Sequence, residues 1–96
     1  MAEREIRDVR FRPTTENDEA DYRRKVKAAL GFLERGYAVR ASVFLRGREN
    51  THPEKGEQLL QRFAAALGDA AVIATAPHRE GTSDITVVMV VMPREN

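Results

Sequence analysis

The chain has 96 residues and no cysteine, which predicts a single domain over residues 1–96 and excludes a disulfide framework or a thiolate metal site. Apolar residues make up 42% of the sequence and charged residues 32%, which favours a packed core with an ordinary polar surface and excludes a disordered chain. The longest apolar run, Val87 to Met92, is too short to span a bilayer and no secretory signal is present, so we expect a cytoplasmic protein without a membrane partner.

The charges are segregated along the chain, although the net charge is only +1. Thirteen of the 16 basic residues are arginine, and the segment Arg35 to Arg48 contains four of them and no acid. The segment Glu16 to Asp21 contains four acids and no base. Because a polyanion responds to local rather than average charge, the near-zero net charge is compatible with such a partner.

The first two predicted elements are a strand and a helix. Asp8 to Arg12 alternates apolar and charged residues and is followed by Pro13, which indicates a half-buried strand. Candidate N-caps follow, and a helix is predicted to about Arg35, with Gly36 closing it. Gly31 inside this helix predicts a close approach to another segment, because glycine costs up to about 1 kcal/mol there. Its apolar stripe consists of Tyr22, Val26, Ala29, Leu30 and Leu33.

A second strand and a second helix follow. Between Val39 and Arg46 the residues alternate strictly, with one apolar face and one face that carries Arg40, Ser42, Phe44 and Arg46. The segment Thr51 to Glu54 resembles a capping box with proline in the first turn of a helix, which Gly68 is expected to end. The apolar stripe of this helix consists of Leu59, Leu60, Phe63, Ala64 and Leu67.

Two further strands complete the chain. A short strand is predicted from Ala70 to Ala76, ended by Pro77 and followed by a polar connection from His78 to Asp84. Ile85 to Met92 is apolar on both faces, as expected of a central strand covered on two sides, and the short connection suggests that it pairs antiparallel with the strand before it.

The order β-α-β-α-β-β predicts an α+β two-layer sandwich, with a mixed four-stranded sheet and both helices on one face. The opposite face would remain open. It would carry Arg10, Arg12, Arg40, Ser42, Phe44 and Arg46.

Enzymatic constellations are scarce, so we expect no enzyme, no cofactor, no metal and no small-molecule substrate. His52 and His78 have no zinc-ligand spacing, and Ser42 and Ser83 lack the turn that exposes a nucleophile. The acids between Glu16 and Asp21 lie where a helix start favours them. An acyl-phosphate hydrolase on a similar sheet would need a phosphate-cradling loop, for which Arg46 to Asn50 is too short a match.

The arginine pattern leaves two interpretations open. Arginine presents a planar fork of donors that matches phosphate and stacks on bases, so several arginines and Phe44 on an open sheet suit RNA. The alternative is a solvated strand face in an arginine-rich sequence, with Phe44 as a packing contact.

The segment Phe44-Leu45-Arg46-Gly47-Arg48-Glu49-Asn50-Thr51-His52-Pro53-Glu54-Lys55-Gly56 resembles the signature of the C-terminal domain of bacterial translation initiation factor 3. Further similar segments extend the resemblance over nearly the whole chain from about Ile6. They are Phe11-Arg12-Pro13, Asp21-Tyr22 with Lys25, Phe32 to Gly36, Leu59 to Arg62, and the apolar last strand ending in Met92-Pro93.

The resemblance implies a non-catalytic domain that binds 16S rRNA on the small (30S) ribosomal subunit. It also implies that the domain prevents association with the large subunit and supports selection of initiator tRNA and start codon. By matching positions, the residues that contact RNA would be Arg12, Tyr22, Lys25, Lys27, Arg46, Arg48 and Arg62. We expect a monomer, and the apolar last strand leaves self-association open as an alternative.

Three positions depart from the family's pattern. Gly81 is followed by Thr82 where an arginine is usual, with Arg79 nearby but not equivalent, and Gly31 and Phe44 stand where relatives often carry a basic residue. Fewer cations would weaken phosphate binding. These departures keep open an alternative, which is a designed or diverged scaffold of the same fold without ribosome function.

Overall fold

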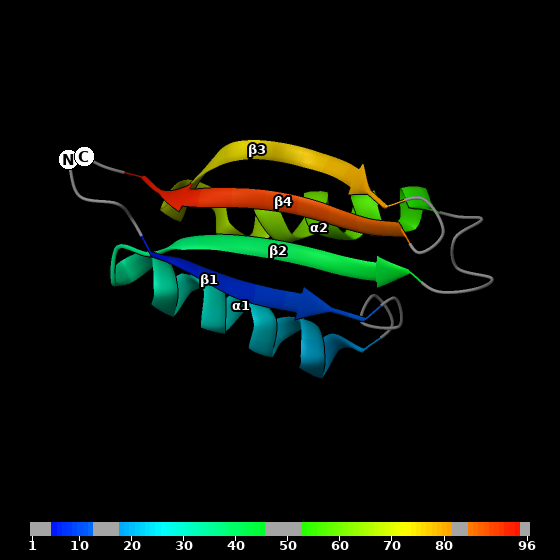
Figure 1. Cartoon of the computed structure of the whole chain (residues 1–96). Helices are drawn as coiled ribbons and strands as arrows, with labels where there is room; N and C mark the ends of the chain where they lie inside the picture. The colour runs from blue at the N-terminus through cyan, green and yellow to red at the C-terminus, as the bar shows by residue number, and fades with distance from the viewer. Residues whose placement is uncertain (1–4, 13–17, 46–52, 82–84, 95–96) are drawn as a thin grey trace.

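The elements follow one another in the predicted β-α-β-α-β-β order. The computed structural model describes residues 5–12, 18–45, 53–81 and 85–94. The elements are β1 (Ile6–Phe11), α1 (Glu19–Glu34), β2 (Ala38–Leu45), α2 (Pro53–Leu67), the 3-10 turn η3 (Gly68–Ala70), β3 (Ala71–Glu80) and β4 (Ile85–Pro93) (Figure 1).

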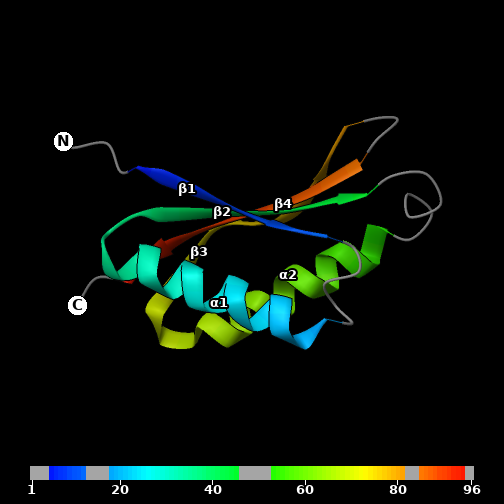
Figure 2. The same cartoon turned by 90° about the horizontal axis from the view of Figure 1, so that it is seen from below.

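The four strands form one mixed sheet in the order β1-β2-β4-β3. β1 and β2 are parallel, whereas β4 pairs antiparallel with both β2 and β3. In Figure 2, α1 and α2 lie on the same face of the sheet, where they contact each other, and none of the described helices covers the opposite face. The predicted α+β sandwich and the antiparallel last pair are therefore confirmed.

The core lies between the sheet and the two helices, and strand alternation explains how it fills. In β2, Val39, Ala41 and Val43 are fully buried on the helix side. Phe63 of α2 is also fully buried and meets Phe11 of β1 edge to face, with ring centroids 5.0 Å apart and planes at 73°. The predicted apolar stripes of both helices pack into this core.

The ends of α1 follow from local chemistry. The carboxylate of Asp18, the residue before the helix, accepts a hydrogen bond of 3.1 Å from the backbone N–H of Asp21, which satisfies one of the unpaired donors of the first turn. Gly36 has φ +88°, which side chains with a Cβ rarely adopt, and it ends the helix as predicted.

The third strand is longer than the sequence suggests. β3 continues through Pro77 to Glu80, so His78 to Glu80 belong to the strand and the prediction of a strand ending at Ala76 is wrong. The reason is that β3 is an edge strand, bonded only to β4, where the missing N–H of proline breaks no second ladder. The register also shifts between Ile73 and Thr75 and between Thr75 and His78, which accommodates the proline.

The last strand is central, as predicted, but helices cover only one of its faces. Val88 points to the open face and is nevertheless only 1% exposed, because Ser42 of β2 and His78 of β3 flank it. Its neighbours on that face, Val90 and Met92, are half-buried. None of the helices in the described ranges is long and apolar enough to cross a membrane.

Close approach of a helix to the sheet occurs at Gly56 of α2, not at Gly31 of α1. A Cβ added at Gly56 would lie 3.0 Å from Cγ2 of Val87 and 3.6 Å from Cβ of Val43. A Cβ at Gly31 would meet no atom of the described residues within 4 Å, so the prediction of a close approach there is wrong.

The same substitution at these two glycines should therefore have opposite effects. Gly31→Ala is expected to raise the free energy of unfolding by up to about 1 kcal/mol through helix propensity. Gly56→Ala is expected to lower it, because overpacking against the fully buried Val87 costs about 1–3 kcal/mol and exceeds that gain. Urea denaturation of the two variants measures both signs, and a stabilised Gly56→Ala would show that α2 can move away from the sheet.

Candidate nucleic-acid interface

Arg12 and Tyr22, two of the residues that the resemblance singles out, lie towards one end of the sandwich. The C-terminal ends of β1 and β2 and the first turns of both helices lie at this end, opposite the chain termini (Figure 1). Arg12 follows β1 here and is exposed. Arg46 and Arg48 come after the last residue of β2 and lie outside the described residues, so their role in RNA binding stays a prediction.

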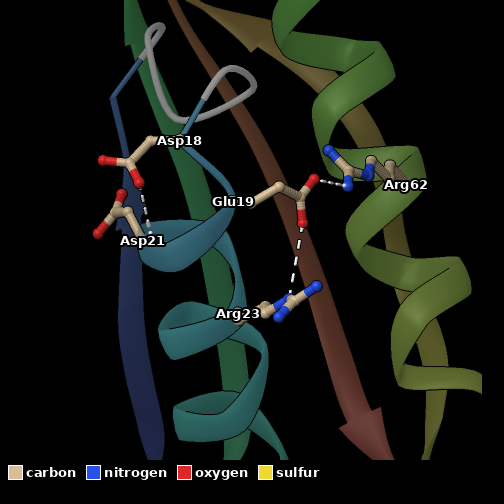
Figure 3. Close-up of polar contacts among 5 residues, drawn as sticks. All are labelled: Asp18, Glu19, Asp21, Arg23 and Arg62. Carbon is tan, nitrogen blue, oxygen red and sulfur yellow. Dashed lines mark hydrogen bonds and ion pairs between the residues drawn. The ribbon is translucent and has the colours of Figure 1, made fainter.

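Arg62 of α2 is held by two side chains of α1. Its guanidinium donates a hydrogen bond of 2.5 Å to the Glu19 carboxylate, as Figure 3 shows. The guanidinium carbon also lies 4.0 Å from the centroid of the Tyr22 ring, which is cation–π geometry. The structure thus brings together two of the predicted contact residues, Tyr22 and Arg62, although 40 positions separate them.

Tyr22 is placed to support Arg62 rather than to present its hydroxyl at the surface. The residue is only 6% exposed, and its buried hydroxyl has no hydrogen-bond partner among the described residues. Burial raises the pKa of the Tyr22 phenol, so it stays protonated at neutral pH. That Tyr22 itself contacts RNA stays a prediction.

Glu19 stabilises this arrangement with charge. The hydrogen bond from Arg62 and its positive charge lower the pKa of Glu19, and Arg23, 3.8 Å away on the same helix, contributes less (Figure 3). The sequence interpretation of Glu19 as a helix-start acid is correct, since it lies in the first turn of α1, but it missed the contact with Arg62. Only the i,i+4 spacing to Arg23 is visible in the sequence.

The lowered pKa gives a direct test of which arginine holds Glu19. The carboxylate stabilises the folded state above the pKa of the unfolded chain, and this contribution is lost as pH falls through the folded pKa. Arg62→Gln should raise the pKa of Glu19 towards its ordinary value, and Arg23→Gln should change it much less. NMR titration of the side-chain carboxyl measures both, and equal effects of the two substitutions would contradict the assignment.

The two lysines that the resemblance implicates do not share a face of α1. Lys25 is half-buried and Lys27 is exposed. Because successive residues turn by about 100° around a helix, positions two apart point in nearly opposite directions. The structure therefore does not join Lys25 and Lys27 into one patch, and their contact with RNA stays a prediction.

Arg79, near the end of β3, forms an ion pair with a carboxylate of α2. Arg79 of β3 donates a hydrogen bond of 2.7 Å to Glu57 of α2, and this ion pair ties the edge strand to the helix. The arginine that the resemblance leads us to expect at the position of Thr82 falls outside the described residues, so whether Arg79 could take its role stays untested.

The basic side chains described above have the chemistry to bind phosphate. Guanidinium and ammonium groups can neutralise phosphates. Because the Tyr22 ring already restricts the Arg62 side chain, less conformational entropy is lost when Arg62 contacts a phosphate. Within the ranges that the structure describes, no group of three or more histidine or carboxylate side chains could hold a metal ion.

Comparison with known proteins finds the same similarity over nearly the whole chain. Residues 4–94 match the family described as "Translation initiation factor IF-3, C-terminal domain". A relative from Xylella fastidiosa named "Translation initiation factor IF-3" is 42% identical over 91 residues, which are 95% of this chain and 48% of the relative. Relatives of the same name from Xanthomonas axonopodis and Anaeromyxobacter dehalogenans are 40% and 43% identical, over 95% and 80% of this chain and 47% and 33% of their own lengths. The chain thus spans about half the length of the curated relatives it matches, or less.

Proposed function

This chain belongs to the family of translation initiation factor IF-3 C-terminal domains, and from that premise we propose that it binds the small ribosomal subunit through 16S rRNA. The observation that carries the proposal is the extent of the family match, which takes in the whole sheet and both helices. Two independent features of the molecule support it. They are the three arginines of β2 and of the motif that follows it, Arg40, Arg46 and Arg48, and the supported guanidinium of Arg62.

In this proposal, binding alone prevents association with the large subunit. A folded domain that occupies an RNA surface which the large subunit must contact excludes that subunit sterically, and no bond is made or broken. Occupation of the same surface would also support the selection of initiator tRNA and of the start codon. The activity therefore requires a stable fold and cations placed for phosphate, both of which are general needs of RNA recognition.

Among the described residues, Arg62 is the contact we expect to matter most. Its guanidinium is oriented by Tyr22 and Glu19 before any RNA arrives, so a phosphate that replaces the carboxylate meets a donor that is already in place. Arg12, Lys25 and Lys27 would add phosphate contacts from the end of β1 and from α1.

The proposal predicts salt-sensitive binding. If about five phosphates are neutralised on structured RNA, the logarithm of the affinity for small subunits should fall with the logarithm of salt concentration, with a slope on the order of −4. Cosedimentation with purified small subunits over a salt series measures the slope. A flat response would contradict phosphate contacts as the source of affinity.

A further inference from the structure

The open face of the sheet carries a second set of nucleic-acid chemistry, away from the helices. Neither of the two described helices covers this face (Figure 2), and β1, β2 and β4 form a hollow of about 460 Å³ on it. The side chains that line the hollow include Asp8, Arg10, Arg40, Ser42, Phe44 and Thr86. None of these residues is among those that the family resemblance assigns to RNA contact.

An exposed aromatic ring and two guanidiniums are the main features of this hollow. Phe44 is 41% exposed, whereas Phe11 and Phe63 are 3% and 0% exposed. Arg40, Ser42 and Phe44 alternate along β2, so each is about 6.7 Å from the next on the same face. Arg10 of β1 lies beside Ser42 in the parallel register.

Two carboxylates, Asp8 and Glu80, lie near the two guanidiniums of the hollow, and neither forms an ion pair with Arg10 among the described residues. Glu80 of β3 lies 3.6 Å from Arg40 and also accepts a hydrogen bond of 2.8 Å from His78, so one carboxylate serves two basic groups. Asp8 is the register partner of Arg40. Arg10 forms no ion pair with any of the described residues, and its guanidinium is therefore available for a phosphate.

We propose that this hollow binds a single-stranded RNA segment, with a base stacked on Phe44 and the adjoining phosphates on Arg10 and Arg40. Sequence-tolerant binding of single strands needs an aromatic platform beside cations, and four-stranded sheets supply it on their open face. The hydroxyls of Ser42 and Thr86 can pair with base edges or the ribose hydroxyl. The choice of RNA rather than DNA rests on the function proposed above, whereas the site itself does not.

NMR titration of the isotope-labelled chain with a short oligouridine tests the site directly. The backbone amides of Arg10, Ser42, Phe44 and Thr86 should shift. Phe44→Leu, which keeps apolar volume but loses the aromatic face, should weaken oligouridine binding at least about fivefold, and Phe44→Trp should retain it. A duplex RNA of the same length should compete poorly.

Two matched variants control for general effects. Ile73→Ala truncates another exposed apolar side chain, 51% exposed on β3, and Arg35→Ala removes an exposed arginine elsewhere. Both should leave oligouridine affinity within about twofold of the parent, as expected for surface changes outside the site. Thermal unfolding of Phe44→Leu verifies that the fold is retained.

The outcomes separate this inference from the function proposed above. Shifts confined to α1 and α2, an unaffected Phe44→Leu variant, or no binding of oligouridine would overturn the open-face site, whatever the result with small subunits. If the parent chain binds oligouridine but does not bind small subunits, the open-face site is supported and the proposed function is rejected.

Discussion

Replacement of Arg46 and Arg48 together by glutamate is expected to abolish binding to the small ribosomal subunit while the fold stays intact. Both belong to the Arg-Gly-Arg-Glu motif that the resemblance identifies, between the end of β2 and the start of α2 in the sequence. Each phosphate contact contributes roughly a tenfold gain in affinity near 0.1 M salt through counterion release, so losing two should cost about a hundredfold or more. The repulsion from two new carboxylates adds to that loss.

The control for this variant is a second pair with the same change in charge. Arg35 follows α1 and Arg94 follows β4, and both lie at the other end of the sandwich, near the chain termini (Figure 1). Arg35→Glu with Arg94→Glu should lower binding only modestly, through long-range charge. Cosedimentation at moderate salt compares the two double variants, and equal losses would mean that overall charge, rather than the motif, determines binding.

Phe63→Ala is expected to have the largest effect on stability. Phe63 is fully buried on α2 and packs edge to face on Phe11, so its truncation leaves a cavity between helix and sheet. Such truncations cost about 3–5 kcal/mol, against a total stability of about 5–15 kcal/mol for a domain. Urea denaturation should show a correspondingly lower midpoint with a similar slope.

The partly exposed Phe44 provides the control for the Phe63→Ala prediction. Phe44→Ala removes the same side chain at a position that is 41% exposed, and we expect a smaller loss of about 1–2 kcal/mol, because only part of the ring is packed. If the two variants lost similar stability, the core would not be organised around Phe63.

Much of the fold could be predicted from the sequence because periodicity reports burial directly. The alternation from Val39 to Leu45 and the stripe around Phe63 both placed their residues on the correct face. Pro77 misled the prediction of β3, because whether a proline ends a strand depends on whether a neighbouring strand needs its N–H. Whether such a neighbouring strand exists depends on the strand order of the sheet, which is set by the whole chain.

The candidate site was less accessible from the sequence, because its contacts join distant positions. Glu19 and Arg62 are 43 residues apart and meet only once α1 and α2 pack side by side. The two glycines show the same limit, since Gly31 and Gly56 are both helical and only tertiary packing distinguishes them. The resemblance identified which residues could bind RNA, and the structure adds which side chains contact and orient them.

Dissociation of intact 70S ribosomes is the measurement that tests the central claim most directly. Sucrose-gradient sedimentation of ribosomes mixed with increasing amounts of the chain should show a falling 70S peak and rising subunit peaks. The variant with glutamate at both Arg46 and Arg48 should leave the 70S peak unchanged. An unchanged 70S peak with saturating amounts of the parent chain would contradict the account and favour a diverged scaffold of the same fold without ribosome function.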